Sequence, residues 1–389
     1  MQLESKLPSV GTTIFTVMSK LAVDHKSINL GQGFPDFNPD QQLLDLVTEA
    51  MSEGHNQYPF MTGVDALRQV IADKVSALYG KSYDKDSEIT VTSGATQAIM
   101  ASVLAVVNPG DEVIVIEPCY DSYIPSIRLA GGIPVVVSMD PPDRDHQTFR
   151  VDWNKVRDAV NPKTRLLILN FPHNPTGAVL ESKDLDAIEQ LVSNTNILLL
   201  SDEVYEHIVF APQGHLSLSS REELAARAFV ISSFGKTTHT TGWKIGYCCA
   251  PAEMTRELRK IHQFMVFTVA SPFQHALAKY TSNPETYRKL PEFYRTKRDR
   301  LRTGLEHTKF RPLECPGTFF LLADYSAISD MNESDFSMWL TKEHGVTVIP
   351  VAAFYSEPSA NTSNHGIVRF CFAKQDATLD SALQRLSAI

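Results

Sequence analysis

Short runs of aliphatic and β-branched residues recur through this 389-residue chain, and they constrain its fold more than any other feature. They are EVIVIE (112–117), IPVVVS (133–138), RLLILN (165–170), NILLLSDEV (196–204), AFVISSF (228–234) and KIGYCCA (244–250). Runs of this kind are typical of strands that are buried on both faces. Helix-like segments separate several of them, such as SKDLDAIEQLVSN, whose apolar residues Leu185, Ile188, Leu191 and Val192 form one stripe. The pattern predicts an α/β fold with a mostly parallel sheet covered by helices on both sides.

The character of the sequence changes after about residue 280. A charged, helix-like stretch over 291–308 precedes the strand-like GTFFLLADYS, the helix-like ESDFSMWLTKEHG and the strand-like GIVRFCFA. We therefore predict a large domain over residues 41–280. A smaller α/β domain is expected from the N-terminal segment 1–40 together with residues 281–389.

Charge and cysteine content exclude several classes of protein. The chain has 36 Lys and Arg against 45 Asp and Glu, a formal net charge of −9 without a basic run. That argues against nucleic acid or a membrane as the main partner. The sequence shows no signal-peptide pattern, and no apolar run approaches the ~20 residues of a membrane span. Five cysteines without a C-x-x-C pair indicate neither a zinc site nor a disulfide framework. We expect a reduced, cytoplasmic protein that holds no metal.

Polar residues that follow the predicted strands are candidates for a binding site, because ligands of such sheets gather at the carboxyl ends of the strands. Asp202 follows four apolar residues and one serine, so its carboxylate is expected to be deep and to need a partner. The partner is either a cation in a structural ion pair or the protonated ring nitrogen of a cofactor. Asn174 lies between Pro172 and Pro175 in a turn-rich loop that directs its amide toward the strand ends, unless this is an ordinary βα loop.

The run ITVTSGATQAIMASVLAVV predicts a strand, a turn of small residues and a buried helix. The free N–H groups of the first helical turn, together with Ser93, Gly94, Ala95 and Thr96, form a natural cradle for a phosphate group. Simple capping of the helix by Ser93 is the alternative.

Two lysines, Lys236 and Lys244, stand in the polar segment SSFGKTTHTTGWKIGY (232–247) after a predicted strand. The segment is not a P-loop, because Val230 stands where that motif requires its first glycine and the acidic strand precedes it. A lysine at the edge of a low-dielectric site is more readily neutral, so it can form a Schiff base with an aldehyde. Pyridoxal 5′-phosphate (PLP) offers that aldehyde, a phosphate, a ring nitrogen that a carboxylate keeps protonated, and a phenolic oxygen. The residues named above include a candidate partner for each of these four groups of PLP.

Arg369 stands in the otherwise apolar strand-like run GIVRFCFA. A guanidinium group inside such a strand needs an anion, and its planar fork fits a carboxylate bidentately. The anion is either a structural Asp or Glu, or the α-carboxylate of an amino acid substrate.

Taken together, the motifs resemble those of a known family. NLGQGFPDF, NQYPFMTGVDALR, TSGATQAI, EPCYDSY, NFPHNPTG, SDEVYE, SSFGKTTHTTGWKIGY and VRFCFA follow the order found in fold-type I, PLP-dependent aminotransferases of class I/II. Over essentially its full length, the chain is most similar to the kynurenine aminotransferase/glutamine transaminase K group and to bacterial methionine aminotransferases. Lys244 stands where many aminotransferases have Arg, and the kynurenine group shares this lysine.

The resemblance implies a role for each matching residue. Lys236 looks like the Schiff-base lysine and proton carrier, Asp202 like the carboxylate on the ring nitrogen, and Tyr205 and Asn174 like the donors to the phenolic oxygen. The aromatic stacked on the ring would be Tyr120, and the phosphate ligands would be Ala95, Thr96, Ser233, Lys244 and Tyr58 of the neighbouring subunit. The substrate would be held at its carboxylate by Gly33, Asn174 and Arg369. Its side chain would lie near Phe15, Phe34, Tyr58, Phe267 and Phe354, some of them from the partner subunit.

The implied activity is ping-pong transamination of a neutral amino acid with a 2-oxo acid acceptor. The donor would be methionine or an aromatic amino acid, with kynurenine or glutamine also compatible, since no second arginine in the motifs would hold a distal carboxylate. A cysteine-conjugate C–S β-lyase is an alternative with the same cofactor geometry. The aminotransferase-like sensor domain of a transcription regulator would need an attached DNA-binding domain, for which the sequence as given has no residues. Tyr58 and Phe267 would complete the neighbour's site, so a homodimer is expected.

Overall fold

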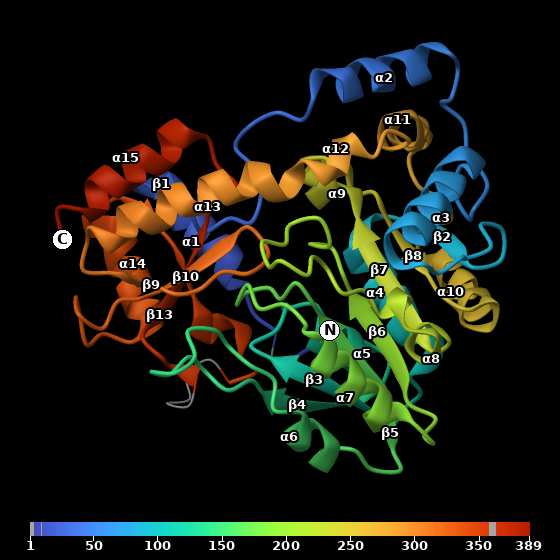
Figure 1. Cartoon of the computed structure of the whole chain (residues 1–389), viewed down its shortest axis with the longest axis horizontal. Helices are drawn as coiled ribbons and strands as arrows, with labels where there is room; N and C mark the ends of the chain where they lie inside the picture. Colours follow the sequence, from blue (N-terminus) through green and yellow to red (C-terminus); the bar gives the residue numbers. More distant parts are fainter. Residues whose placement is uncertain (1–3, 9, 358–362) are drawn as a thin grey trace.

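The structure is a computed structural model that describes residues 4–8, 10–357 and 363–389. Its centre is a seven-stranded sheet in the order β2-β8-β7-β6-β5-β3-β4 (Figure 1). The strands are β2 (Ile89–Thr92), β3 (Glu112–Glu117), β4 (Ile133–Ser138), β5 (Thr164–Asn170), β6 (Leu198–Asp202), β7 (Ala228–Ser233) and β8 (Gly246–Cys249). Each corresponds to a strand predicted from the sequence, with ends that agree within two residues.

The pairing of this sheet confirms the mostly parallel fold. Neighbouring strands are parallel from β4 through β3, β5 and β6 to β7. Strand β8 is the exception, because it runs antiparallel to both β7 and β2, which was not predicted from the sequence. Since β8 is reversed, the residues that precede it lie at the same edge of the sheet as the residues that follow β6 and β7.

Helices cover both faces of the sheet, as predicted. On one face Val113, Val115 and their neighbours pack against α4 (Gly94–Val106), α5 (Tyr123–Leu129) and α10 (Ala252–Met265). On the other face Ile114 and its neighbours pack against α6 (Trp153–Asp158), α7 (Ser182–Val192) and α8 (Glu222–Ala225). Helix α7 buries the stripe expected from its sequence, Leu185, Ile188, Leu191 and Val192.

The prediction of strands buried on both faces is wrong for β4. This strand is at the edge of the sheet, and its Ile133 and Val136 are 46% and 40% exposed. An edge strand has a neighbour on one side only, so the covering helices do not enclose it fully.

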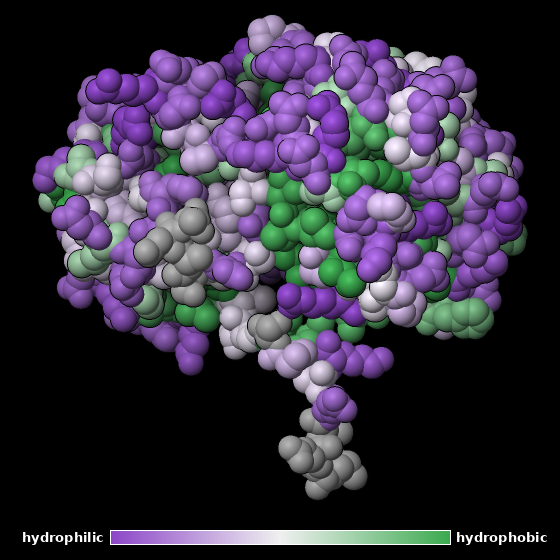
Figure 2. Space-filling model, turned by 90° about the horizontal axis from the view of Figure 1, so that it is seen from below, coloured by the Kyte–Doolittle hydropathy of each residue, from purple (hydrophilic) through white to green (hydrophobic). Residues whose placement is uncertain are grey.

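Seen from below, the molecule is largely hydrophilic with a hydrophobic area near the centre of that face (Figure 2).

A second group of elements joins the two ends of the chain (left in Figure 1). Its antiparallel sheet has the order β12-β13-β10-β9, formed by Ile349–Pro350, Ile367–Cys371, Phe320–Asp324 and Arg311–Pro312. The N-terminal strand β1 (Ile28–Asn29) pairs with β11 (Val346–Thr347). The helices here are α1 (Ile14–Asp24), α13 (Leu290–Glu306), α14 (Glu333–Glu343) and α15 (Asp376–Leu386). The domain boundaries proposed from the sequence stay a prediction.

Helices α2 (Gln41–Ser52), α3 (Asp65–Tyr79) and α11 (Ser271–Thr281) share a hydrophobic core with β2 and β8. The short α12 (Glu285–Arg288) lies between α11 and α13 in the chain, and its Tyr287 packs in the core that includes α13 and the smaller sheet. All five cysteines are buried as free thiols. Within the described part of the chain, no helix has the length and apolar character needed to cross a bilayer.

Candidate active site

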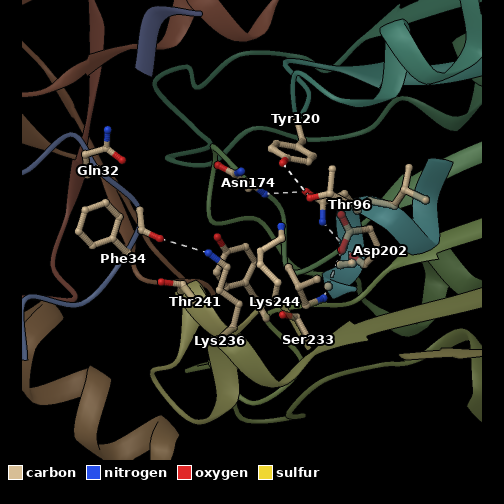
Figure 3. Close-up of a pocket in the computed structure, with 18 residues that line it drawn as sticks. Gln32, Phe34, Thr96, Tyr120, Asn174, Asp202, Ser233, Lys236, Thr241 and Lys244 are labelled. Carbon is tan, nitrogen blue, oxygen red and sulfur yellow. Dashed lines mark hydrogen bonds between the residues drawn. The ribbon is translucent and has the colours of Figure 1, made fainter. Parts of the chain in front are cut away.

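A cavity of about 460 Å³ opens where the strands of the large sheet end, between that sheet and the segment after β1. Figure 3 shows side chains from several elements converging on it. Twelve of the residues proposed from the sequence line this cavity: Gly33, Phe34, Gly94, Ala95, Thr96, Tyr120, Asn174, Asp202, Tyr205, Ser233, Lys236 and Lys244. Strands β5, β6 and β7 deliver residues at their carboxyl ends, whereas Lys244 arrives at the amino end of the reversed β8.

Lys236 lies in the short helix α9 (Phe234–Thr237) that follows β7 directly. Its Nζ donates to the backbone carbonyl of Gly33 at 3.1 Å and lies 5.5 Å and 5.2 Å from the ring centroids of Tyr205 and Phe319. Burial removes the ammonium form from water and lowers the pKa of Lys236 from 10.5 to about 8. Near neutral pH an appreciable fraction of this lysine is therefore a free amine, which is a nucleophile.

Asp202 ends β6 with its carboxylate buried at 4% exposure. Its Oδ2 accepts a hydrogen bond from the Tyr123 hydroxyl at 2.7 Å, and its Oδ1 accepts a long one from the Val204 amide at 3.4 Å. Burial raises the pKa of Asp202 from 3.8 to about 6, although the Tyr123 hydrogen bond opposes the shift. Among the described residues Asp202 forms no ion pair, so the structural ion pair considered above is not found.

Asn170 fixes the two polar groups beside it. Its Nδ2 donates to the backbone carbonyl of Asp202 at 2.9 Å, and its Oδ1 accepts from the backbone N–H of Asn174 at 3.0 Å. The Asn174 side chain in turn accepts a hydrogen bond from Arg369 through Oδ1 at 2.6 Å. Because Oδ1 of Asn174 accepts from Arg369, the NH₂ group is the part of this side chain that can donate a hydrogen bond to a ligand.

The amino end of α4 provides a site for an anion. Gly94 begins this 13-residue helix with φ +72°, and a Cβ added there would meet Lys244 Cε at 3.2 Å. Ser93 makes no side-chain cap, so the simple capping alternative is not found. Unpaired N–H groups of a first helical turn, with an ammonium group close by, attract a phosphate or another anion.

Arg369 lies behind the wall of the cavity, in β13, and is 1% exposed. Its guanidinium carbon lies 3.8 Å from the ring centroid of Phe320 and 4.8 Å from that of Phe354. Besides Asn174 it donates to the Gly31 carbonyl at 3.1 Å, while its Nε has no partner. No carboxylate of the described chain forms an ion pair with it, and burial lowers its pKa from 12.5 to about 10. The group therefore lacks the anion that a buried guanidinium requires.

Four proposed residues lie away from the cavity. Phe15 and Phe354 pack edge to face at 5.6 Å and line a neighbouring cavity of about 470 Å³, whose wall also includes Tyr120. Tyr58 and Phe267 lie on the surface, 81% and 47% exposed, with ring centroids 5.4 Å apart. A single chain does not bring these two residues to its own cavity, and their contribution to a partner's site stays a prediction.

Sequence reasoning missed several residues of the site. The hydroxyl of Tyr123 reaches Asp202 from a helix 79 residues away in the chain, and no local pattern marks that contact. Gln32, Asn170 and Thr241 also line the cavity. Asn170 was identifiable, because it is a polar residue at the carboxyl end of an apolar run in the same way as Asp202.

Comparison with known proteins agrees with the geometry. The family model described as "Aminotransferase class I and II" matches residues 25–386. The chain is 49% identical to a methionine aminotransferase of Escherichia coli over 98% of this chain and 97% of that protein. It is 34% identical to human kynurenine–oxoglutarate transaminase 3, over 98% and 89%.

Solved structures resemble this one closely. The crystal structure of an Escherichia coli protein with methionine aminotransferase function superposes with a TM-score of 0.96, at 48% identity and full coverage of both chains. The N-succinyldiaminopimelate aminotransferase of Mycobacterium tuberculosis superposes with a TM-score of 0.95, at 41% identity and again full coverage. With the family model matching nearly the whole chain and the fold shared throughout, this protein belongs to the class I and II aminotransferase family.

Proposed function

We propose that this aminotransferase binds PLP in the cavity at the strand ends and transfers the amino group of a neutral amino acid to a 2-oxo acid. The observation that carries the proposal is Lys236, an amine with a pKa near 8 whose charge interacts with those of Asp202 and Lys244. A nucleophilic amine placed between a buried carboxylate and an anion-binding helix end matches the three poles of PLP, which are its aldehyde, ring nitrogen and phosphate.

The unsatisfied groups of the cavity fit this cofactor. The buried Asp202 carboxylate forms no ion pair with any residue that the structure describes, and the protonated ring nitrogen would supply the missing positive charge. The amino end of α4, with Ala95, Thr96, Ser233 and Lys244, would hold the phosphate. The Tyr205 hydroxyl and the NH₂ of Asn174 would donate to the phenolic oxygen, and Tyr120 would cover the ring. The family is generally PLP-dependent, which supports the assignment.

The bound cofactor supplies an aldehyde carbon that accepts amines and a protonated ring that withdraws electrons. Lys236 is proposed to carry the proton away from the amino acid Cα, since its amine is available near neutral pH. Asp202 holds the ring proton in place by remaining charged. Arg369, with Asn174 and the backbone of Gly33, orients the α-carboxylate. The first 2-oxo acid would leave before the acceptor binds to the same residues, and this order of release and binding would give ping-pong kinetics.

The proposed donors are methionine and aromatic amino acids. The residues that contact Arg369 from the side of the neighbouring cavity are the aromatic Phe15 and Phe354, which suit an apolar side chain. The Escherichia coli relative at 49% identity is named for methionine, which supports the same choice here. We also propose that the enzyme is a cytoplasmic homodimer, in keeping with its five unpaired thiols and its exposed Tyr58 and Phe267.

The visible absorption spectrum of the purified protein tests the cofactor and the reaction together. We expect a yellow protein whose band disappears when methionine is added and returns when a 2-oxo acid follows. The Lys236→Ala variant should lose turnover by at least about a thousandfold, because both amine chemistry and proton transfer depend on that nitrogen. A protein that PLP does not colour, or a Lys236→Ala variant with intact turnover, would refute the proposal.

A further inference from the structure

Glu333 is a buried charge to which transamination assigns no role. It is the first residue of α14 and is 1% exposed, beside the small sheet that carries Arg369. Among the described residues it forms no ion pair. A carboxylate buried without a cation is costly, so hydrogen bonds must hold it in place.

The two carboxylate oxygens of Glu333 accept three hydrogen bonds from the backbone. Oε2 accepts from the Ala352 amide at 2.5 Å, and Oε1 accepts from the amides of His365 and Ile367 at 2.9 Å and 3.0 Å. Burial raises the pKa of Glu333 from 4.5 to about 7, while these backbone donors act in the opposite direction. The carboxylate thus joins two chain segments that no regular strand pairing connects at this point.

Both segments lead to the group that is proposed to bind substrate. Ile367 is two residues before Arg369 in β13, and Ala352 is two residues before Phe354 in the short helix η3 (Val351–Phe354). The ladder between β12 and β13 pairs Ile349 with Arg369 and Pro350 with Val368. Glu333 connects the two segments just beyond the end of this ladder, at Ala352 and Ile367. The Phe354 carbonyl also accepts a hydrogen bond from the Cys119 amide at 2.7 Å, next to Tyr120.

We propose that Glu333 is a positioning residue for recognition of the substrate's α-carboxylate. By binding Ala352 and Ile367 with one rigid group, it fixes the ring of Phe354 at 4.8 Å from the guanidinium carbon of Arg369. The rings of Phe354 and Phe320 both pack against the guanidinium group of Arg369. By holding Phe354, Glu333 sets the direction in which Arg369 faces the substrate. The inference rests on the proposed function, in which Arg369 binds that carboxylate.

The first experiment is the steady-state kinetics of Glu333→Gln with methionine and a 2-oxo acid. Gln keeps the shape but replaces one acceptor oxygen with an NH₂ group that opposes a backbone N–H. We expect KM for methionine to rise about tenfold with kcat changed less than about threefold, because Arg369 holds the carboxylate equally in the ground and transition states. A purely structural role would instead lower kcat through loss of folded enzyme and leave KM unchanged. That second result would overturn the inference.

A pair of substrates isolates the carboxylate. Methionine and 3-(methylthio)propylamine differ only in that group, and the absorbance change of a single turnover can be followed with each. Relative to the wild type, Glu333→Gln should need about tenfold more methionine for half-maximal single-turnover rate, and the same concentration of the amine. Equal losses with both would refute the inference. As a readout apart from activity, calorimetric binding of 3-(methylthio)propionate should weaken about tenfold.

Two further variants separate this inference from the proposed function. Glu343→Gln changes an exposed carboxylate on the same helix and should leave KM unchanged. Arg369→Lys should raise KM for methionine, and adding Glu333→Gln to it should cost little more, since both act on one interaction. If Arg369→Lys leaves KM unchanged, the proposed carboxylate site fails. If only Glu333→Gln leaves it unchanged, the inference fails and the proposed function stands.

Discussion

At the scale of single residues, the pKa of Lys236 is the property that decides whether the cavity is reactive. Burial lowers it to about 8, so at pH 8 about half of the side chain is neutral, roughly a hundredfold more than for an ordinary lysine. In protein freed of PLP, the rate of recombination with PLP should therefore rise with pH up to about 8 and then level off. The rate is followed by the visible absorbance. A rate that keeps rising toward pH 10.5 would contradict the lowered pKa.

Tyr123 controls the protonation of Asp202. Its hydroxyl donates to Oδ2 and so favours the charged carboxylate, which means that Tyr123→Phe raises a pKa that is already about 6. More Asp202 is then protonated at pH 7, and the acidic limb of the kcat–pH profile should move to higher pH by about one unit. We expect roughly a threefold loss of kcat at pH 6.5, because the charged fraction of Asp202 falls from about three quarters to about one quarter, and almost no loss at pH 8.5. Equal losses at both pH values would contradict this role.

The residues that the sequence identified and those that it missed differ in a physical way. Asp202, Asn174 and Lys236 each follow an apolar strand, and a polar residue at that position is visible in the local sequence. Tyr123 and Glu333 act across 79 and 34 residues, on a carboxylate and on backbone amides. Contacts of that kind depend on how helices dock on the sheet, and the local pattern does not encode this.

At the scale of elements, the strand positions were predicted and the direction of β8 was not. Apolar runs set the strand ends, because each run stops where the chain leaves the core. A parallel neighbour needs a long crossover, usually a helix, and the polar segment before β8 carries no helix pattern, so the absence of a crossover was a local signal for the reversed strand. The reversal matters for the site, since it brings Lys244 to the amino end of α4.

The junction of α4 with Lys244 gives a prediction about cofactor affinity. Gly94→Ala places a Cβ at 3.2 Å from Lys244 Cε, at a φ of +72° that disfavours any side chain. We expect a stability loss of about 1 kcal/mol and PLP affinity weakened by at least about tenfold, since Lys244 must move. Thermal unfolding without PLP and titration with PLP measure the two effects.

Gly80→Ala is the matched control. Gly80 has a φ of +76° at the end of α3, but a Cβ there meets nothing within 4 Å. The control should lose similar stability and keep its affinity for PLP. If the two variants lose PLP affinity equally, the α4 junction is not the phosphate site.

At the scale of the whole molecule, the site depends on parts of the chain that lie far apart in sequence. The pairing of β1 with β11 joins Ile28 to Val346, and the segment after β1 brings the Gly33 carbonyl to Lys236. The sequence predicts that both ends form one smaller α/β unit, yet strands of two residues carry too little pattern to reveal their partners.

The predicted homodimer follows from side chains that a single chain leaves exposed. Tyr58, Phe60 and Phe264 are 81%, 81% and 87% exposed, which is unusual for large apolar groups on an isolated enzyme. If Tyr58 completes the partner's site, each active site takes its Lys236 from one chain and its Tyr58 from the other. The variants Tyr58→Ala and Lys236→Ala then damage residues that the two chains contribute to one site. Refolding or exchanging the two inactive variants together should then restore activity.

The size of that recovery is fixed by symmetry. Random pairing makes half of the dimers mixed, and each mixed dimer has one site with native Lys236 and native Tyr58, the latter from the other chain. Activity should therefore reach about a quarter of the wild-type value, well above either variant alone. Activity no greater than the mean of the two parents, with mixed dimers demonstrated by mass spectrometry, would mean that each chain builds its site alone. Tyr58 would then have to reach the cavity of its own chain by a movement of the surface on which it is 81% exposed.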